Sequence, residues 1–187
     1  MHILLETGRL RLRRFTLDDV DRLVELDSDP QVMRYITYGV PTPRSAYETV
    51  YLPRWFALYD AEPGQGYFAA ELLDTGDFIG WFHLRRDRIE PRYMELGYRL
   101  RRSAWGHGHA TEGSRALLRH GFATLELDCI SARTLLGNLA SQRVMQKCGL
   151  RESGRFVYAE DVIAGRSEAE RQAVKYEITR SEWTSTA

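Results

Sequence analysis

The segment from Glu95 to Thr111 constrains the fold of this chain more than any other. Its first part alternates in the manner of a half-buried strand. One face of that strand would carry Tyr93, Glu95, Gly97 and Arg99, and the other Met94, Leu96, Tyr98 and Leu100. After a short connection, Gly106 and Gly108 precede a segment whose apolar residues recur with helical period. This order predicts an anion site, because the first helical N–H groups have no internal partners and glycine lets a phosphate approach them.

The spacing of the glycines distinguishes between three kinds of phosphate loop. A Walker loop needs Gly-Lys-Ser/Thr after its second glycine, whereas this chain has Gly108-His109-Ala110. A dinucleotide-binding loop needs a third glycine where Thr111 stands, and it follows a wholly apolar strand, whereas this strand carries Glu95 and Arg99. Dinucleotide binding stays a weak alternative, supported by an acid, Asp128, at a tolerable distance. The third kind fits better: the segment 105–110, Trp-Gly-His-Gly-His-Ala, resembles the Gln/Arg-x-x-Gly-x-Gly/Ala loop of the GNAT N-acetyltransferases, which binds the pyrophosphate of acetyl-CoA.

Composition narrows the class of protein. The 187 residues are 43% hydrophobic, which predicts one packed domain over residues 1–187. Lys and Arg number 26 and Asp and Glu also 26, so no charge signature indicates nucleic acid binding. No run has the apolar length of a membrane helix, and the N-terminus lacks a signal-peptide pattern. Cys129 and Cys148 lack metal-ligand spacing and suggest a reduced, cytoplasmic protein with two buried thiols, although one disulfide stays open.

The order of the expected elements extends the resemblance to most of the chain. Strands are expected at 9–13, 67–73, 78–86, 91–100, 128–135, 150–159 and 172–180. Helices are expected after Thr16, from Asp29-Pro30, over 45–59 with a kink or division at Pro53, from Ala110 to Leu125, and over 138–148 with Gly149 at the C-terminal end. That order is the order of elements in the GNAT fold.

Four separate blocks resemble the RimJ/RimL-type branch of this family. They are 5–13 with 29–33, 78–81, the glycine loop 105–110, and 138–141 with 147–150. The resemblance implies an α+β fold whose central, mostly antiparallel, twisted sheet of about seven strands splays around the CoA site and is flanked by helices. It also implies an acyl-CoA-dependent N-acetyltransferase (EC 2.3.1.-) with acetyl-CoA as co-substrate.

The resemblance also implies the residues that would bind acetyl-CoA. Backbone N–H groups of the glycine loop would hold the pyrophosphate, and the edge of the preceding strand would pair with the pantetheine arm, with a bulge N–H polarising the thioester. The candidates are Tyr98, Arg99, Leu100, Gly106, His107, Gly108, His109, Ala110, Thr111 and Asn138. Asn138 could equally cap its helix, or do both. A metal pair of His107 and His109 would compete with phosphate for the same backbone, so no metal is expected and both histidines should face solvent.

Two residues are candidates for catalysis. An ammonium cannot attack a thioester, and an α-amine of pKa about 8 is roughly a tenth neutral at pH 7. Glu95 is the candidate base, directly or through water; otherwise it is a solvated edge carboxylate. Ser141 is the candidate acid for the leaving thiolate; otherwise it is an ordinary first-turn serine. Another branch of the family uses a glutamate and a tyrosine where this chain has Arg133 and Met145, so those roles must be filled elsewhere.

The acceptor is the least constrained part of the interpretation. Candidate contacts are Tyr35, Trp55, Trp81, His83 and Tyr158, with Glu160 and Asp161 available to attract a cation. A protein N-terminus, a polyamine, an amino sugar antibiotic and an amino acid all remain open. We expect no nucleic acid or membrane partner, and a homodimer is compatible with the sequence. The alternative of a different class is a catalytically silent acyl-CoA-binding regulatory module.

Overall fold

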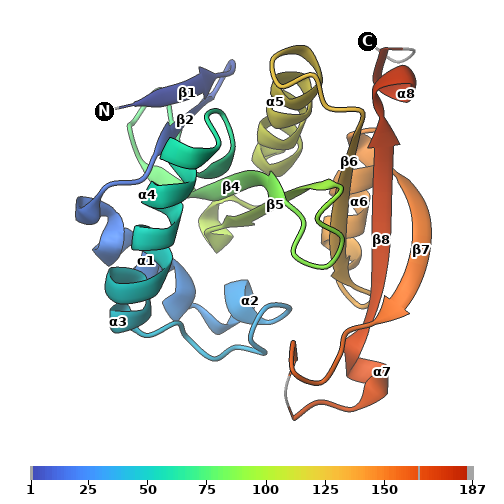
Figure 1. Cartoon of the computed structure of the whole chain (residues 1–187). Coiled ribbons are helices and arrows are strands. Elements are labelled where there is room, and N and C mark those ends of the chain that lie inside the picture. The colour runs from blue at the N-terminus through green and yellow to red at the C-terminus, as the bar shows by residue number, and fades with distance from the viewer. Residues whose placement is uncertain (1, 164, 185–187) are drawn as a thin grey trace.

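The computed structural model describes residues 2–163 and 165–184 and builds them around one sheet of eight strands (Figure 1). The strand order is β1-β2-β3-β4-β5-β6-β8-β7, and every neighbouring pair is antiparallel except β5 and β6. The strands are β1 (Ile3–Glu6), β2 (Leu10–Arg14), β3 (Gly66–Leu72), β4 (Phe78–Arg86), β5 (Met94–Leu100), β6 (Cys129–Leu135), β7 (Arg151–Val157) and β8 (Gln172–Thr179). The predicted mostly antiparallel sheet is confirmed, with β1 as a strand that the sequence pattern did not predict.

The helices begin and end largely where local signals place them. The longer ones are α1 (Val20–Ser28), α4 (Leu52–Ala61), α5 (His109–Ala123) and α6 (Leu139–Lys147). The short ones are η1 (Leu17–Asp19), α2 (Pro30–Met33), α3 (Arg44–Ala46), the π turn η2 (Tyr47–Tyr51), η3 (Arg102–Ala104), α7 (Glu168–Arg171) and α8 (Arg180–Thr184). The carboxylate of Asp29 accepts a hydrogen bond from the N–H of Gln31 at 2.9 Å and caps α2, as the Asp-Pro pair predicts. The expected division near Pro53 is confirmed, since Pro53 lies in the first turn of α4.

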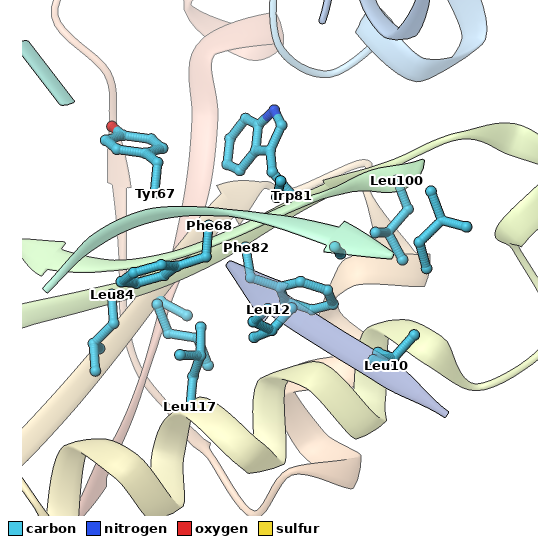
Figure 2. Packing of buried hydrophobic residues seen from close by; sticks show 14 of the residues in the cluster. Leu10, Leu12, Tyr67, Phe68, Trp81, Phe82, Leu84, Leu100 and Leu117 are labelled. Carbon is cyan, nitrogen blue, oxygen red and sulfur yellow. The ribbon is translucent and has the colours of Figure 1, made fainter. Parts of the chain in front are cut away.

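The central strands carry two different apolar faces. Figure 2 shows Tyr67 and Trp81 on one side of the strands, and Phe68, Phe82 and Leu84 on the other, toward Leu117 of α5. The two-residue period of the strands accounts for this separation. We refer to the side of Tyr67 and Trp81 as the upper face and to the side of α5 as the lower face. The predicted alternation of β5 is confirmed, because Tyr98 packs on Phe82 while the Arg99 guanidinium lies over Trp81.

Strands β5 and β6 separate soon after they meet. Within the described residues they pair at Met94 with Ile130 and at Glu95 with Ser131. Strand β6 stays paired with β8 along its whole length, and β5 stays paired with β4. The facing edges of 96–100 and 132–135 therefore have no partner strand, and the sheet splays there as the family resemblance implies.

The expected bulge in β5 is not present. Strand β5 pairs with β4 in one register, from Arg86 opposite Met94 to Gly80 opposite Leu100. The irregularity lies instead between β3 and β4, where the register shifts next to Gly80. Gly80 has a φ of +135°, and a Cβ there would lie 2.1 Å from the carbonyl oxygen of Arg99, so the close approach of β4 to β5 requires glycine.

Candidate active site

The splay between β5 and β6 opens into a cavity of about 800 Å³. Residues of both sheet faces line it, so it passes through the sheet between the two strands. It brings together most of the residues singled out from the sequence: Tyr35, Trp81, His83, Glu95, Tyr98, Arg99, Leu100, Gly106, Gly108, His109, Ala110, Thr111, Asn138, Ser141 and Tyr158. Residues of α2, β6, α6 and the segment after β7 complete the wall.

Two predicted contacts lie away from this wall. Trp55 is 6% exposed and stacks on Tyr67 at 4.4 Å, so it is a core residue of α4 and the expected contact with the acceptor is corrected. His107 lies on the glycine loop but is not among the lining residues. Its backbone carbonyl accepts a hydrogen bond from Arg9 at 2.9 Å.

The glycine loop presents backbone donors to the cavity. Gly106 and Gly108 have φ values of +79° and +83°, which a side chain with a Cβ rarely adopts. The first hydrogen bond within α5 runs from the Glu112 N–H to the Gly108 carbonyl. The N–H groups of residues 109–111 therefore have no partner inside the helix, and they lie at the positive end of its dipole. This is an arrangement that suits a pyrophosphate.

A carboxylate on α5 ties the turn between β1 and β2 to this loop. Glu112 accepts hydrogen bonds from the Thr7 hydroxyl at 2.6 Å and from Arg9 Nε at 2.7 Å. Burial raises the pKa of Glu112, but these hydrogen bonds outweigh it and leave the pKa below its usual value. The contact joins residues about a hundred positions apart, so no local sequence pattern predicts it.

His109 corrects the expectation that both loop histidines face solvent. The residue is 8% exposed, and burial lowers its pKa, so the neutral form is favoured. Among the residues that the structure describes, no group of three or more His, Cys, Asp or Glu side chains could hold a metal ion. Cys148 is buried on the wall and Cys129 is half-buried, and both thiols are free.

Glu95 lies on the upper face of β5, next to the point where β5 and β6 separate. Its side chain is 15% exposed and forms an ion pair with Arg85 of β4 at 2.6 Å. Burial raises the pKa of Glu95, and the guanidinium of Arg85 opposes that shift. Arg85 also donates a hydrogen bond to the Tyr67 hydroxyl at 2.7 Å. Residues 85 and 95 are opposite one another in the β4–β5 register, which the sequence alone did not reveal.

His83 is a second titratable neighbour of Glu95. Its Nε2 lies 3.9 Å from Glu95 Oε2, and its side chain is 10% exposed. The ring stacks on Trp81 at 5.7 Å and meets the edge of Tyr67 at 5.0 Å. Burial, together with the charges of three arginines, holds the pKa of His83 well below its usual value.

Ser141 lies on the opposite side of the gap, in the first turn of α6. The backbone N–H of Ser141 donates to Asn138 Oδ1 at 3.2 Å, so Asn138 caps the helix. The Ser141 side chain lies close enough to the phenol of Tyr98, on the lower face, to influence its pKa. Burial raises the pKa of Tyr98 to about 12, and the neighbouring Ser141 side chain moderates that shift. Glu95 and Ser141 thus belong to opposite faces of the sheet and line one cavity.

Arg133 and Tyr158 complete the wall near Glu95. The side chain of Arg133 is 2% exposed and is held by ion pairs to Asp87 and to Glu90, so it supplies no acid or base. Burial raises the pKa of Tyr158 to about 12, and the charge of Glu95 adds to the shift. The phenol of Tyr158 therefore stays protonated at neutral pH.

The family model described as "Acetyltransferase (GNAT) domain" matches residues 9–151 of this chain. The chain belongs to the GNAT acetyltransferases. It is also 32% identical over 193 residues to the FsC-acetyl coenzyme A-N(2)-transacetylase of Aspergillus fumigatus, covering 96% of this chain and 77% of that one. The family resemblance found in the sequence is thereby confirmed.

Solved structures agree on the fold. The GNAT acetyltransferase of Bacillus anthracis superposes with a TM-score of 0.75 at 26% identity, over 97% of this chain and 99% of that one. A spermidine N-acetyltransferase of Vibrio cholerae, in complex with CoA and spermine, superposes with a TM-score of 0.75 at 19% identity, over 95% and 99%. In the described part of this GNAT chain, no helix has the length and apolar character to cross a membrane.

Proposed function

We propose that this protein transfers the acetyl group of acetyl-CoA to a primary amine by direct attack in a ternary complex. One observation carries the proposal: a single cavity passes between β5 and β6, with Glu95 at its upper side and Ser141 at its lower side. The two groups then flank the position of a thioester that enters through the gap.

The glycine loop and the open strand edge would position the donor. The free N–H groups of residues 109–111 suit the pyrophosphate, and the unpaired edge of 96–100 suits the amide groups of the pantetheine arm. The acetyl group would then lie near the branching point of the two strands, beside Glu95.

The acceptor would enter from the upper face, where Trp81, His83 and Tyr158 line the cavity. As the amine nitrogen bonds to the carbonyl carbon, one N–H proton passes to the Glu95 carboxylate, whose raised pKa suits this task. The C–S bond then breaks, and the Ser141 hydroxyl hydrogen-bonds or protonates the leaving thiolate. No covalent enzyme intermediate is needed, which is consistent with the buried, unreactive Cys148, whose pKa is raised to about 11 by burial.

The test is the release of free CoA thiol from acetyl-CoA by the purified protein in the presence of a panel of amines. The panel contains peptides with free N-termini, amino acids, amino sugars and alkylamines. Thiol release that depends on an amine, with the mass of the acetylated product, would support the proposal. Tight binding of acetyl-CoA without turnover on any amine would indicate a silent acyl-CoA-binding module instead.

A further inference from the structure

His83 and Glu95 are neighbours on the cavity wall, and each carries a hydrogen-bond acceptor. The distance of 3.9 Å between His83 Nε2 and Glu95 Oε2 is too long for a direct hydrogen bond. The two side chains therefore do not pair with one another, although both line the cavity on the upper face. Glu95 Oε2 is paired with Arg85, whereas His83 Nε2 has no partner among the described residues.

The fold reserves space for the His83 ring. Gly97 lies opposite His83 in the β4–β5 register, and a Cβ at Gly97 would lie 2.6 Å from the imidazole Cε1. The backbone of Gly97 does not have a left-handed φ, so the ring, and not the backbone, is what requires glycine here. Trp81 and Tyr67 hold the ring from two other sides.

The ring nitrogens lack partners. No residue that the structure describes forms a hydrogen bond with Nδ1 or Nε2 of His83, and both atoms are buried. A buried polar atom left unpaired is costly, so a built cavity with such an atom on its wall points to a ligand that pairs with it. Burial and the charges of Arg85, Arg88 and Arg99 favour the neutral imidazole, which keeps one lone pair for accepting a hydrogen bond.

We propose that His83 Nε2 and Glu95 Oε2 together hold the nitrogen of the acceptor and thereby select primary amines; this rests on the acetyl transfer proposed above. A neutral primary amine has two N–H groups and one lone pair. One nitrogen can donate to two acceptors 3.9 Å apart through bonds of about 3 Å each, which leaves the lone pair for the thioester carbon.

The two acceptors then have different fates in the reaction. The N–H that faces Glu95 gives up its proton to Oε2 as the C–N bond forms. The N–H that faces His83 stays on the nitrogen and becomes the N–H of the amide product, while Nδ1 carries the ring proton throughout. A secondary amine brings one N–H, and when that N–H faces Glu95 the buried His83 Nε2 stays unpaired.

The test compares the most active primary amine of the panel with its N-methyl derivative, by kcat/KM for thiol release. The wild-type protein should prefer the primary amine by on the order of 10²-fold or more, as sites built around a hydrogen bond do. The variant His83→Phe keeps the ring and its packing on Trp81 but removes both nitrogens. We expect it to lose roughly 10- to 100-fold on the primary amine and much less on the N-methyl amine, so that the preference collapses.

Three controls accompany this variant. His2→Phe changes an exposed histidine at the sheet edge and should leave both amines unaffected. His83→Gln offers an amide oxygen and should restore part of the preference. Gly97→Ala should reproduce the loss of preference by displacing the ring. An unchanged preference in both His83→Phe and Gly97→Ala would overturn the inference.

A wild-type protein that acetylates no amine would refute the proposed function, and the inference is then decided by NMR. In the protein saturated with CoA, hexylamine should shift the Nε2 resonance of ¹⁵N-labelled His83 and leave that of His2 in place. An Nε2 resonance that does not respond to hexylamine would overturn the inference.

Discussion

At the scale of single residues, the proposed chemistry depends most on the carboxylate of Glu95. Glu95→Gln keeps the size of the side chain but cannot accept a proton. We expect a loss on the order of 10²-fold in kcat/KM near neutral pH, with partial recovery at higher pH as more of the amine arrives neutral. Acetyl-CoA affinity, measured by calorimetry, should hardly change. Glu152→Gln, on the exposed strand β7, is the matched control and should leave kcat/KM unchanged. Near-wild-type turnover of Glu95→Gln would contradict the prediction and make Glu95 a structural residue.

The raised pKa of Glu95 also predicts how the same substitution affects stability. A carboxyl whose pKa is raised on folding contributes stability that is fully present below its unfolded pKa and is lost as pH rises through the folded pKa. Ionisation of Glu95 therefore costs stability, and at pH 7 Glu95→Gln should unfold at the same or a higher temperature than the wild type. At pH 4 the difference should shrink. A clear fall in Tm at pH 7 would show that the ion pair with Arg85 outweighs the burial of the charge.

Ser141 is expected to act late in the reaction. If its hydroxyl assists the departing thiolate, the interaction grows in the transition state, so Ser141→Ala should lower kcat more than it raises KM for acetyl-CoA. Steady-state kinetics on the best amine of the panel measures both. Ser153→Ala, on the exposed strand β7, should change neither parameter. A rise in KM with kcat intact would reduce Ser141 to a contact residue.

At the scale of elements, the junction of β5, the glycine loop and α5 decides how acetyl-CoA binds. Gly108 and Gly76 have similar left-handed backbones, with φ of +83° and +75°, but Gly76 lies in the hairpin between β3 and β4 and faces open space. Valine at either position should cost comparable stability. We expect Gly108→Val alone to weaken acetyl-CoA binding, by roughly tenfold or more, as about 1.4 kcal/mol of lost phosphate contact implies. Equal affinity in both variants, measured by calorimetry, would exclude the loop from the binding site.

Elements with local signals could be predicted from the sequence, and contacts between distant elements could not. Gly149, with a φ of +88°, ends α6 as its position predicts, and Asp29 caps α2. The ion pair of Arg85 with Glu95, however, depends on the register between two strands. An aromatic residue on an amphipathic helix, such as Trp55, has the same sequence pattern whether it packs in the core or contacts a ligand. Strand β1 is four residues long, too short for its alternation to stand out.

At the scale of the whole molecule, the charges around the cavity bear on the acceptor. Among the described lining residues, Glu95 is the one carboxylate, and it is paired with Arg85. The cationic lining residues are Arg34, Arg99, Arg133, Arg143 and Lys147. The described part of this wall has no unpaired carboxylate to bind a second positive charge on the acceptor. The fold that this chain shares with a spermidine N-acetyltransferase is therefore not by itself a reason to expect the same substrate.

We therefore expect monoamines to be better acceptors than polyamines. Hexylamine and 1,6-diaminohexane differ by one ammonium, and kcat/KM should favour hexylamine by about tenfold or more, since one unmatched charge costs on the order of 1.4 kcal/mol. Added salt should narrow the difference because it screens the repulsion. A preference for the diamine or for spermidine would show that Glu160 and Asp161, outside the cavity wall, dominate the approach of the acceptor.

The sparse pairing of β5 with β6 affects how cooperatively the two parts of the sheet, β1 to β5 and β6 to β8, open and close. The hydrogen-bond ladder that makes a sheet cooperative is interrupted between them beyond two residue pairs. A pantetheine arm in the gap would form the hydrogen bonds that are missing between the two strands. The co-substrate would then act as a temporary ninth strand. The local opening of strands 96–100 and 132–135 would then follow the cellular supply of acetyl-CoA, and the protein would be most susceptible to proteolysis when that supply runs low.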